Sequence, residues 1–333
     1  MIALPQDVAF IIHKIEKAGF EAFAVGGCIR DSLLSRTPND WDITTSALPE
    51  QVKALFPHTI DTGIKHGTVT VMCHHVGYEV TTYRIDGEYE DGRHPKQVVF
   101  TPSLIEDLKR RDFTINAMAY NDSRGLVDAF EGQQDLQKGV IRAVGEPEKR
   151  FSEDALRIMR AVRFAAQLGY TIEEETEAAM RRLSDTLTKI SAERIQVELV
   201  KLLVSDHPGH MKILYETGIT KVIMPEFDRM METEQNNPHH LYSVGMHTIR
   251  AMEEVPADKV LRLTMLFHDM GKPAKKTTDA EGIDHFHGHA ELSAKMAKEI
   301  LQRLKFDNDT IGKVTKLVKN HDRKIIPQAK YVR

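Results

Sequence analysis

Cysteine, tryptophan and long apolar runs are all scarce in this sequence of 333 residues. Only Cys28 and Cys73 occur, so no disulfide framework is available and packing must hold the fold. No apolar run reaches the roughly 20 residues that a membrane-spanning helix needs, and the N-terminus carries Pro5 and Asp7 instead of a basic and then apolar leader. We therefore expect a cytoplasmic protein without a membrane segment.

A surplus of positive charge is also missing. The sequence has 45 Lys and Arg against 49 Asp and Glu, so a nucleic-acid partner would have to be met by local basic patches. Hydrophobic residues make up 41% and charged residues 28%, which is ordinary for a globular protein. The length exceeds what one core needs and suggests two or three domains of roughly 100 to 150 residues.

Apolar patterns in the first part of the chain predict both helices and strands. Apolar residues at helical spacing predict helices, and short apolar runs bounded by glycine or charge predict strands. Helices are expected at residues 6–20 and 50–56 and directly after Gly26-Gly27, and strands at residues 22–25, 41–45, 68–73 and 78–83, with a turn at 75–77. This order indicates a small α/β unit with a mixed sheet.

From Phe151 onward the strand signals vanish and helical periodicity replaces them, with helices expected at residues 155–168, 174–183 and 193–203. A polar break at residues 236–238 then precedes a histidine-rich segment between His239 and His289. We predict an α+β protein with an α/β head at residues 1–145, an all-α neck at 146–235 and a further helical domain at 236–333. The sequence ends without a closing helix, so either the protein stops unusually early or this last domain is truncated.

Two aspartates begin one of the predicted strands. Asp40 and Asp42 are two residues apart, and the strand period points both side chains to one face. With 49 acids in the chain about seven such pairs arise by chance, so the pair alone favours a solvated turn. Gly26 and Gly27, a dozen residues upstream, open a helix whose free N–H groups suit a phosphate. The alternative is a plain tight turn in which Arg30 bonds a neighbour.

A third acid, Glu79, lies in the strand predicted at residues 78–83. If that strand is beside the first, three carboxylates converge, and their mutual repulsion calls for a divalent cation. Ligands that are all oxygen indicate Mg²⁺. Bound Mg²⁺ can activate an attacking hydroxyl and stabilise a departing phosphate, so nucleotidyl transfer is the simplest interpretation.

Four motifs in a fixed order carry a resemblance to a known family. They are GGCIRD at residues 26–31, DWD at 40–42, RRDFTINAM at 110–118 and EDALR at 153–157. Together they closely resemble the motifs of class II tRNA nucleotidyltransferases, the CCA-adding enzymes, and of bacterial poly(A) polymerases. The resemblance covers about residues 20–205 and implies a nucleotidyltransferase head followed by a helical neck that binds nucleotide and RNA.

The resemblance implies template-independent addition of C, C and A to the 3′ end of tRNA. The partners would be CTP, ATP and the acceptor stem and 3′ end of tRNA, and pyrophosphate would be released. Poly(A) polymerase or A-adding activity is the alternative, as is a fragment with only RNA-binding or hydrolase activity. A segment at residues 84–100 resembles the flexible loop that class II enzymes need to switch from C to A, which favours CCA or A addition. The sequence does not give the oligomeric state.

The same resemblance implies roles for individual residues. Asp40 and Asp42 would hold the catalytic Mg²⁺, with Glu79 as a third catalytic acid. The implied nucleotide-binding residues are Gly26, Gly27, Arg30, Arg111, Asp112, Asn116, Asp154, Arg157, Arg160 and Arg163.

Spacing gives a separate expectation for two pairs among these residues. Asp112 and Asn116 would share one helical face, and Asp154 and Arg157 would lie together on one helix. In the family the second pair reads the incoming base. By spacing alone, ordinary helical polar pairs are the alternative for both.

The histidine-rich segment carries a second resemblance. His268-Asp269 follows an apolar run at residues 261–267, with His247 before it, and this pattern resembles the HD phosphohydrolase superfamily. Candidate ligands are His247, His268, Asp269, His289 and Asp322, and they suit a second divalent metal, with Mn²⁺, Fe, Ni²⁺, Zn²⁺ and Mg²⁺ all open. Active phosphatase or phosphodiesterase chemistry and purely structural packing both remain open. The basic run from Lys313 either helps to hold tRNA or forms a solvated helix face.

Overall fold

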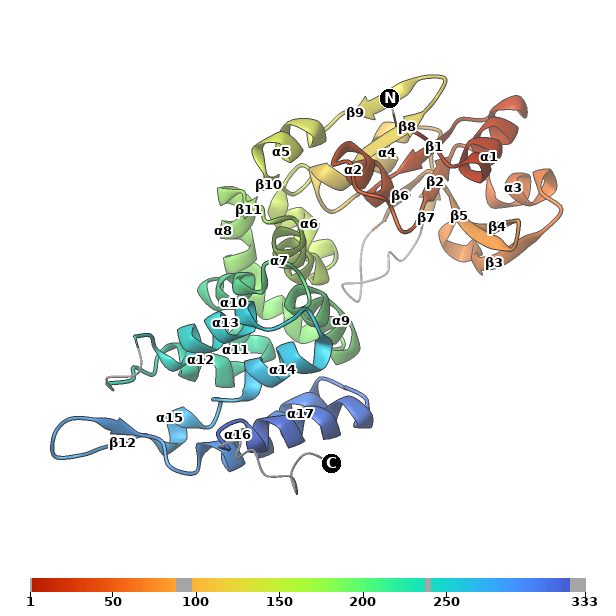
Figure 1. The fold of residues 1–333 in the computed structure, drawn as a ribbon. Helices are drawn as coiled ribbons and strands as arrows, with labels where there is room; N and C mark the ends of the chain where they lie inside the picture. The colour runs from red at the N-terminus through yellow and green to blue at the C-terminus, as the bar shows by residue number, and fades with distance from the viewer. Residues whose placement is uncertain (1, 88–97, 237–240, 324–333) are drawn as a thin grey trace. The chain divides into compact units, whose positions relative to one another are not determined.

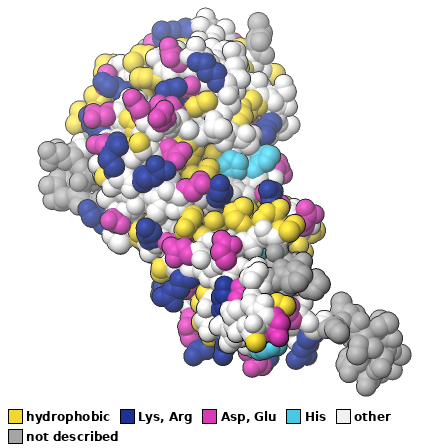
Figure 2. Space-filling model, turned by 90° about the vertical axis from the view of Figure 1, so that its left-hand side faces the viewer, with side chains coloured by type: hydrophobic (Ala, Val, Ile, Leu, Met, Phe, Trp, Pro, Cys, Tyr) yellow, Lys and Arg dark blue, Asp and Glu magenta, His cyan; other side chains and the backbone are white. Residues whose placement is uncertain are grey.

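A computed structural model describes residues 2–87, 98–236 and 241–323 (Figure 1). Its contacts divide the chain into two compact units. Unit 1 consists of Met1–Arg157 with Thr171–Ala179, and unit 2 of Ile158–Tyr170 with Met180–Arg333. No helix among the described residues is long and apolar enough to cross a membrane. On the face drawn in Figure 2, basic and acidic side chains are interspersed, as a nearly balanced charge leads one to expect.

Unit 1 is built on a seven-stranded sheet with the order β3-β4-β5-β2-β1-β8-β9. The strands are β1 Ala22–Val25, β2 Asp42–Thr45, β3 Thr59–Gly63, β4 Thr68–Cys73, β5 Val76–Thr82, β8 Met118–Asn121 and β9 Gly125–Asp128. The β2–β5 pair is parallel, whereas β2 pairs antiparallel with β1 and β5 pairs antiparallel with β4. The predicted mixed sheet is therefore confirmed.

Unit 1 also contains short helices, of which the first four pack against this sheet. They are α1 Gln6–Lys17, α2 Gly27–Leu33, α3 Pro49–Leu55, α4 Leu104–Lys109, α5 Gly132–Lys138 and α6 Pro147–Glu153, with 3₁₀ turns at Ile64–His66 and Thr114–Asn116. Leu104 and Leu108 of α4 pack into a buried cluster with Phe23, Val25 and Tyr83. This packing fixes α4 beside the sheet, and the polar residues of α4 and of the segment after it reach the strand ends.

Six further strands among the described residues form three small pairs. They are β6 Arg84–Asp86 with β7 Val98–Phe100, β10 Val140–Ile141 with β11 Thr171–Ile172, and β12 Thr277–Thr278 with β13 Asp284–His285, the β10–β11 pair being parallel. The central part of the segment predicted as a flexible loop at residues 84–100 lies outside the described residues.

Helices make up nearly all of the rest. They are α7 Leu156–Leu168, α8 Glu174–Leu183, α9 Ala192–Leu203, α10 Met211–Glu216, α11 Ile219–Ile223, α12 Pro225–Met231, α13 Val244–Glu254, α14 Lys259–Phe267, α15 Lys272–Lys275, α16 His289–Arg303 and α17 Asn308–Asn320, with 3₁₀ turns at Ser184–Lys189 and Pro208–His210. The α+β class is confirmed, and the helices predicted at 155–168, 174–183 and 193–203 form within one residue.

Three details of the predicted elements are wrong. The chain is not purely helical after Phe151, because β11, β12 and β13 occur there. The turn predicted at residues 75–77 is centred instead on His74 and His75, which have positive φ angles of 46° and 67°. Strand β5 therefore begins at Val76. Strands β3, β8 and β9 were not predicted. The domain bounds at 145 and 235 stay a prediction.

Candidate functional site

The first candidate site lies in unit 1 at the ends of β2 and β5. The parallel register pairs Ile43 with Val80, so Asp42 and Glu79, each one residue earlier, stand side by side on neighbouring strands. Both line a pocket of about 180 Å³ whose other charged residues are Arg84, Arg110 and Arg111. The sequence predicted that these carboxylates converge if the two strands are neighbours. Strands β2 and β5 are neighbours, and Asp42 and Glu79 lie close together.

Negative charge is concentrated in this pocket. Burial and nearby Asp40 raise the pKa of the Asp42 carboxyl, and Arg111 offsets part of this effect. Burial, Asp42 and Asp40 raise the pKa of Glu79 as well. These two carboxyls with raised pKa, and Asp40 near both, form an oxygen-only donor set whose repulsion a hard divalent cation would relieve. The residues present therefore fit a metal such as Mg²⁺.

A buried carboxylate on α4 holds the arginines that face these acids. Asp107 is fully buried, and its Oδ1 accepts hydrogen bonds from Arg110 Nε at 3.0 Å and Nη2 at 2.7 Å. Its Oδ2 accepts from Arg111 Nη2 at 3.3 Å and from Thr44 Oγ1 of β2 at 3.2 Å. Burial alone would raise the pKa of Asp107, but the two arginines lower it, so it remains an anion.

Asp107 was missed by sequence reasoning. A signal was available, because Asp107 lies three and four residues before the two arginines, the spacing of helical ion pairs. The buried Nε of Arg111 has no hydrogen-bond partner among the described residues and is thus a donor available for a ligand.

The glycine turn packs directly against this arginine. Gly26 has a φ of 85°, and a Cβ there would lie 3.2 Å from Arg111 Nη1 and 3.8 Å from the Asn116 carbonyl oxygen. A side chain would therefore be strained and would crowd the arginine. Gly27 begins α2 directly after this turn.

Arg30 links the turn to the RRDFTINAM segment. It donates to Asp31, as the alternative interpretation expected, and its Nη1 also donates to Asn116 Oδ1 at 2.8 Å. Asn116 Nδ2 in turn donates to Asp112 Oδ1 at 3.2 Å. Asp112 and Asn116 are thus hydrogen-bonded to each other. They do not share an α-helical face, because Asn116 lies in the 3₁₀ turn at Thr114–Asn116 and Asp112 precedes that turn.

The expected pairing of Asp154 with Arg157 on one helix is wrong. Asp154 is the C-cap of α6, and its Oδ1 accepts a hydrogen bond from the Leu156 backbone at the start of α7. Arg157 lies in α7, where its Nη1 pairs with Glu153 Oε2 at 2.7 Å and its Nη2 donates to the Arg110 carbonyl. The base-reading role of the pair stays a prediction.

The two later arginines of α7 differ in their surroundings. Arg163 is buried, its Nε donates to Glu198 Oε2 of α9, and its Nη1 donates to Gln167 at 2.8 Å. Its guanidinium also lies 3.7 Å from the centre of the Phe164 ring. The guanidinium of Arg160 is 5.3 Å from the same ring. This geometry favours an ion pair that braces unit 2 as the role of Arg163 over contact with a nucleotide.

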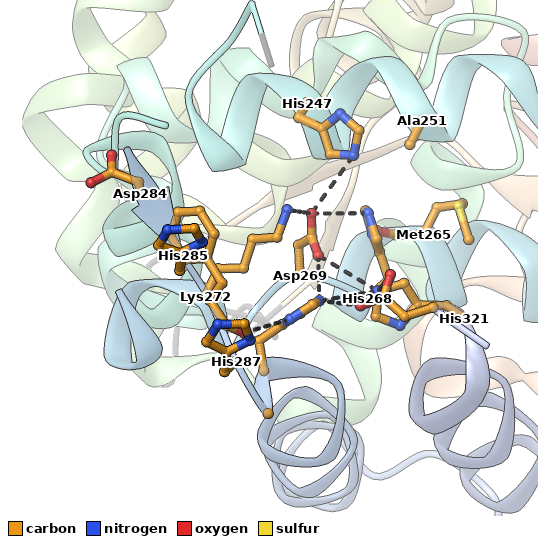
Figure 3. Close-up of a pocket in the computed structure, with 14 residues that line it drawn as sticks. His247, Ala251, Met265, His268, Asp269, Lys272, Asp284, His285, His287 and His321 are labelled. Carbon is orange, nitrogen blue, oxygen red and sulfur yellow. Dashed lines mark hydrogen bonds and ion pairs between the residues drawn. The ribbon is translucent and has the colours of Figure 1, made fainter. Parts of the chain in front are cut away.

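The second candidate site is a pocket of about 650 Å³ in unit 2, lined by histidines around Asp269 (Figure 3). His247 comes from α13, His268 and Asp269 follow α14, His289 begins α16 and His321 follows α17. Their Nε2 atoms lie between 3.2 and 3.6 Å from an Asp269 carboxylate oxygen. The predicted ligands except Asp322 therefore meet at one carboxylate.

Two residues of this site differ from the expectation. His321 was not predicted as a ligand, although it is the neighbour of the residue that was. Asp322 is 60% exposed, and its Oδ2 reaches His289 Nε2 at 3.2 Å from the rim. The resemblance to HD proteins indicated an aspartate, Asp322, as the last ligand and gave no reason to include His321.

The imidazoles are oriented as metal ligands are. The Nδ1 atoms of His268, His289 and His321 bond the carbonyl oxygens of Met265, Phe286 and Val318 at 2.7, 2.9 and 2.7 Å. A carbonyl only accepts, so Nδ1 donates, and in a neutral ring the lone pair of Nε2 then faces the carboxylate.

The Asp269 carboxylate itself calls for a cation. Burial would raise its pKa, but the surrounding imidazoles lower it, so it is ionised at neutral pH. Its buried Oδ2 accepts no hydrogen bond of good geometry, although the Nζ of Lys272 lies 2.8 Å away as an ion-pair partner. Residues that offer nitrogen lone pairs beside a buried anion fit a divalent metal, and two groups of three such ligands occur among the described residues.

Known protein families match three successive parts of the chain. The poly A polymerase head domain matches residues 22–142, the probable RNA and SrmB-binding site of polymerase A matches 169–231, and the HD domain matches 239–333.

Several characterised proteins are similar to the chain. The CCA-adding enzyme of Leuconostoc mesenteroides is 55% identical over 204 residues, which are 60% of this chain and 51% of that protein. The CCA-adding enzyme of Lactiplantibacillus plantarum is 55% identical over 221 residues, 66% of this chain and 53% of that protein. The chain thus spans about half the length of the curated relatives it matches.

Solved structures are similar over nearly the whole chain. The Bacillus stearothermophilus CCA-adding enzyme in complex with CTP is 34% identical, with a TM-score of 0.72 over 98% of this chain and 71% of that one. The Thermotoga maritima CCA-adding enzyme complexed with tRNA is 22% identical, with a TM-score of 0.64 over 96% of this chain and 70% of that one, and it supports the fold alone.

Fold and sites together define a protein with a polymerase-type nucleotidyltransferase head, a helical middle part and an HD domain. The match to the structure of the Bacillus CCA-adding enzyme then identifies one family within this class. The chain belongs to the family of CCA-adding enzymes.

Breaking the Arg163–Glu198 pair tests its structural role. Arg163→Met leaves Glu198 buried without its counter-ion and should lower the free energy of unfolding by about 3–5 kcal/mol. Arg163→Met with Glu198→Met should regain most of this loss, because an apolar pair of similar volume replaces the charges. Urea unfolding measures both. If the stable double variant no longer bound nucleoside triphosphate, that result would support the predicted contact between Arg163 and the nucleotide.

The raised pKa of Asp42 gives a prediction with a definite sign. A carboxyl whose pKa is higher in the folded than in the unfolded state destabilises the fold once pH rises above that pKa. Asp42→Asn should therefore raise the Tm of the metal-free chain at pH 7, and the gain should vanish as pH falls to about 4 or lower. Calorimetry over this range checks it, with the exposed Glu50→Gln on α3 as control. A gain in Tm that does not depend on pH would contradict the electrostatic cause.

Proposed function

We propose that this chain is a template-independent nucleotidyltransferase that adds C, C and A to the 3′ end of tRNA from CTP and ATP. The observation that carries the proposal is the convergence of Asp42 and Glu79 on one pocket with Arg111. Support also comes from relatives named CCA-adding enzymes and from a 34% identical enzyme solved with CTP. The substrates are thus CTP, ATP and tRNA, and pyrophosphate is the leaving group.

The residues of the pocket divide the work of this reaction. Asp40 and Asp42 would hold Mg²⁺, which when bound makes the attacking 3′-hydroxyl more acidic and neutralises the departing pyrophosphate. Glu79 adds a third carboxylate beside them. Arg111, fixed by Asp107 on one side, presents its unpaired Nε to the triphosphate, where a charge-assisted hydrogen bond is strong.

The residues around the pocket would complete nucleotide binding. Arg30 ties the glycine turn at Gly26 and Gly27 to Asn116, which places the turn beside Arg111. We assign Asp112 and Asn116 to the ribose, and Asp154 and Arg157 to the base, with Arg160 as a further contact to the triphosphate.

The proposed domain bounds and the proposed cellular location rest on the same interpretation. We propose a catalytic head at residues 1–145, a neck that binds nucleotide and RNA at 146–235 and an HD domain at 236–333. Both cysteines are free thiols, which suits a reducing compartment such as the cytoplasm.

A nucleotide-incorporation assay tests this function. A tRNA that lacks its terminal CCA should be extended fully only when CTP and ATP are both present, and extension should depend on Mg²⁺. Asp40→Ala and Asp42→Ala should each lower incorporation by at least about 10³-fold, because they remove proposed metal ligands. Asp61→Ala, which removes an exposed acid of β3, is the matched control. Extension by ATP alone without any C would favour poly(A) or A-adding activity instead.

We also propose that the pocket around Asp269 hydrolyses phosphoesters with a bound divalent metal. The oriented imidazoles around the buried Asp269 carboxylate favour this over structural packing. The ligands would hold the metal, which supplies a more acidic bound water when present.

Hydrolysis of p-nitrophenyl phosphate and bis(p-nitrophenyl) phosphate separates this second function from the first. Asp269→Asn should lower turnover with added Mn²⁺, Co²⁺ or Ni²⁺ by at least about 10²-fold and spare nucleotide incorporation. Asp40→Ala should do the reverse, and the exposed His74→Ala of unit 1 should affect neither. Absence of metal-stimulated hydrolysis of both esters would leave the pocket with a structural or binding role.

A further inference from the structure

The 3₁₀ turn at Thr114–Asn116 is held in place by three contacts to its first residue. The Thr114 hydroxyl donates a hydrogen bond to Asp135 Oδ2 of α5 at 2.7 Å, and the Thr114 backbone N–H donates to the Arg142 carbonyl at 3.0 Å. The Thr114 carbonyl oxygen lies so close to Gly132 of α5 that a Cβ there would collide with it. Thr114 and Asp135 are both buried. Helix α5 therefore fixes where this turn lies.

Helix α5 is itself tied to the sheet of unit 1 (Figure 1). Asp128, the last residue of β9, accepts hydrogen bonds at 2.8 Å from the backbone N–H groups of Gly132 and Gln133. Strand β9 pairs with β8, which begins at Met118, just after the turn. The turn is thus connected to the sheet along the chain through β8 and across space through α5.

The carboxylate of Asp135 is a strong acceptor for the Thr114 hydroxyl. Arg142 is its counter-ion, with Nε at 3.3 Å from Asp135 Oδ1 and 3.2 Å from Oδ2, and with Nη1 at 3.3 Å from Glu173 Oε1. The side chain of Asp135 is buried whereas that of Arg142 is 41% exposed, so the guanidinium lies on the solvent side of the carboxylate. A hydroxyl that bonds a paired carboxylate is held more firmly than one that bonds a neutral acceptor.

The turn and the residues just before it carry the two side chains assigned to the ribose. Asp112 Oδ1 accepts hydrogen bonds from the Phe113 backbone N–H at 2.8 Å and from Asn116 Nδ2 at 3.2 Å. Asn116 Oδ1 in turn accepts from Arg30 Nη1 at 2.8 Å. Both donors to Asp112 belong to the segment that Thr114 joins. A displacement of Thr114 would therefore turn the Asp112 carboxylate and shift the Asn116 amide.

We propose that Thr114 and Asp135 are positioning residues that make the chain select ribonucleotides over deoxyribonucleotides. The inference rests on the proposed function and on its assignment of Asp112 and Asn116 to the ribose. Thr114 and Asp135 act through these two residues, because their hydrogen bond holds Asp112 and Asn116 where they can bond the ribose 2′-hydroxyl. A hydroxyl contributes to selectivity only when its partners keep good hydrogen-bond geometry, and a displacement of about 1 Å is enough to lose it.

The test compares ATP with 2′-deoxy-ATP as substrates of the full chain. Extension of a tRNA that ends in CC by one nucleotide gives kcat/KM for each substrate, and the ratio of the two values measures selectivity for the 2′-hydroxyl. Thr114→Val replaces the hydroxyl by a methyl group of similar volume, and Asp135 keeps Arg142 as its partner, so the variant should fold. We expect the ratio to fall by about tenfold or more through a higher KM for ATP, with little change for 2′-deoxy-ATP. Thr114→Ser, which keeps the hydroxyl, should retain the ratio of the unaltered chain.

Further variants separate positioning from stability. Asp135→Ala should lower the ratio as Thr114→Val does, and the double variant should lower it no further, because both changes remove the same hydrogen bond. Glu173→Gln is the matched control, since it alters the other partner of Arg142 without touching Thr114, and it should leave the ratio unchanged. Thermal unfolding shows how far each variant weakens the fold, and a general loss of stability would affect both nucleotides alike.

The possible failures can be told apart. If the unaltered chain extends the tRNA with neither nucleotide, the proposed function is wrong. If it uses both nucleotides with equal kcat/KM, the assignment to the ribose is wrong and this inference fails with it. If it prefers ATP, and folded Thr114→Val or Asp135→Ala keeps that preference, the inference alone is wrong. A loss of preference in Glu173→Gln as large as that in Asp135→Ala would also contradict it.

Discussion

The parallel pairing of β2 with β5 is the constraint on which the head depends. Because their register is fixed by buried residues such as Ile43 and Val80, Asp42 and Glu79 are forced together at one edge of the sheet. The sheet gains its packing at the cost of placing these acids close together and partly out of water, and the pKa of both carboxyls is raised first by burial and then by neighbouring carboxylates. A strand register chosen by the core therefore creates the demand for a cation.

The arginines neutralise only part of the negative charge of Asp42 and Glu79. Asp107 holds Arg110 and Arg111 from a fully buried position, so their guanidinium groups cannot swing onto Asp42 and neutralise it completely. The pKa of Asp42 stays raised even though Arg111 is close. A buried anion that restrains a cation thus keeps negative charge available for metal and leaves the Nε of Arg111 available for phosphate.

How far the sequence predicted the structure depends on whether a feature is local. The strand at Ala22–Val25, three helices of the neck and the position of Asp42 at the start of β2 follow from short periodic patterns and were predicted. Asp154 and Arg157 were placed on one helix because spacing alone does not reveal that α6 ends at Glu153 and that α7 begins only at Leu156. Glu198 and His321 act through partners on other elements, and a single sequence contains no direct signal for such contacts, whereas the spacing of Asp107 to Arg110 and Arg111 did carry a signal.

The two sites solve the same electrostatic problem with different ligands. In the head, Asp42 and Glu79 line a pocket, offer only oxygen ligands and have raised pKa values, so a hard and well-hydrated ion suits them. Around Asp269 a single anion is buried among imidazoles whose lone pairs are fixed by carbonyls, which suits a softer metal. Because the two donor sets differ in kind, the two parts of this chain should respond independently to the metals that are present, and removal of one ion need not impair the other site.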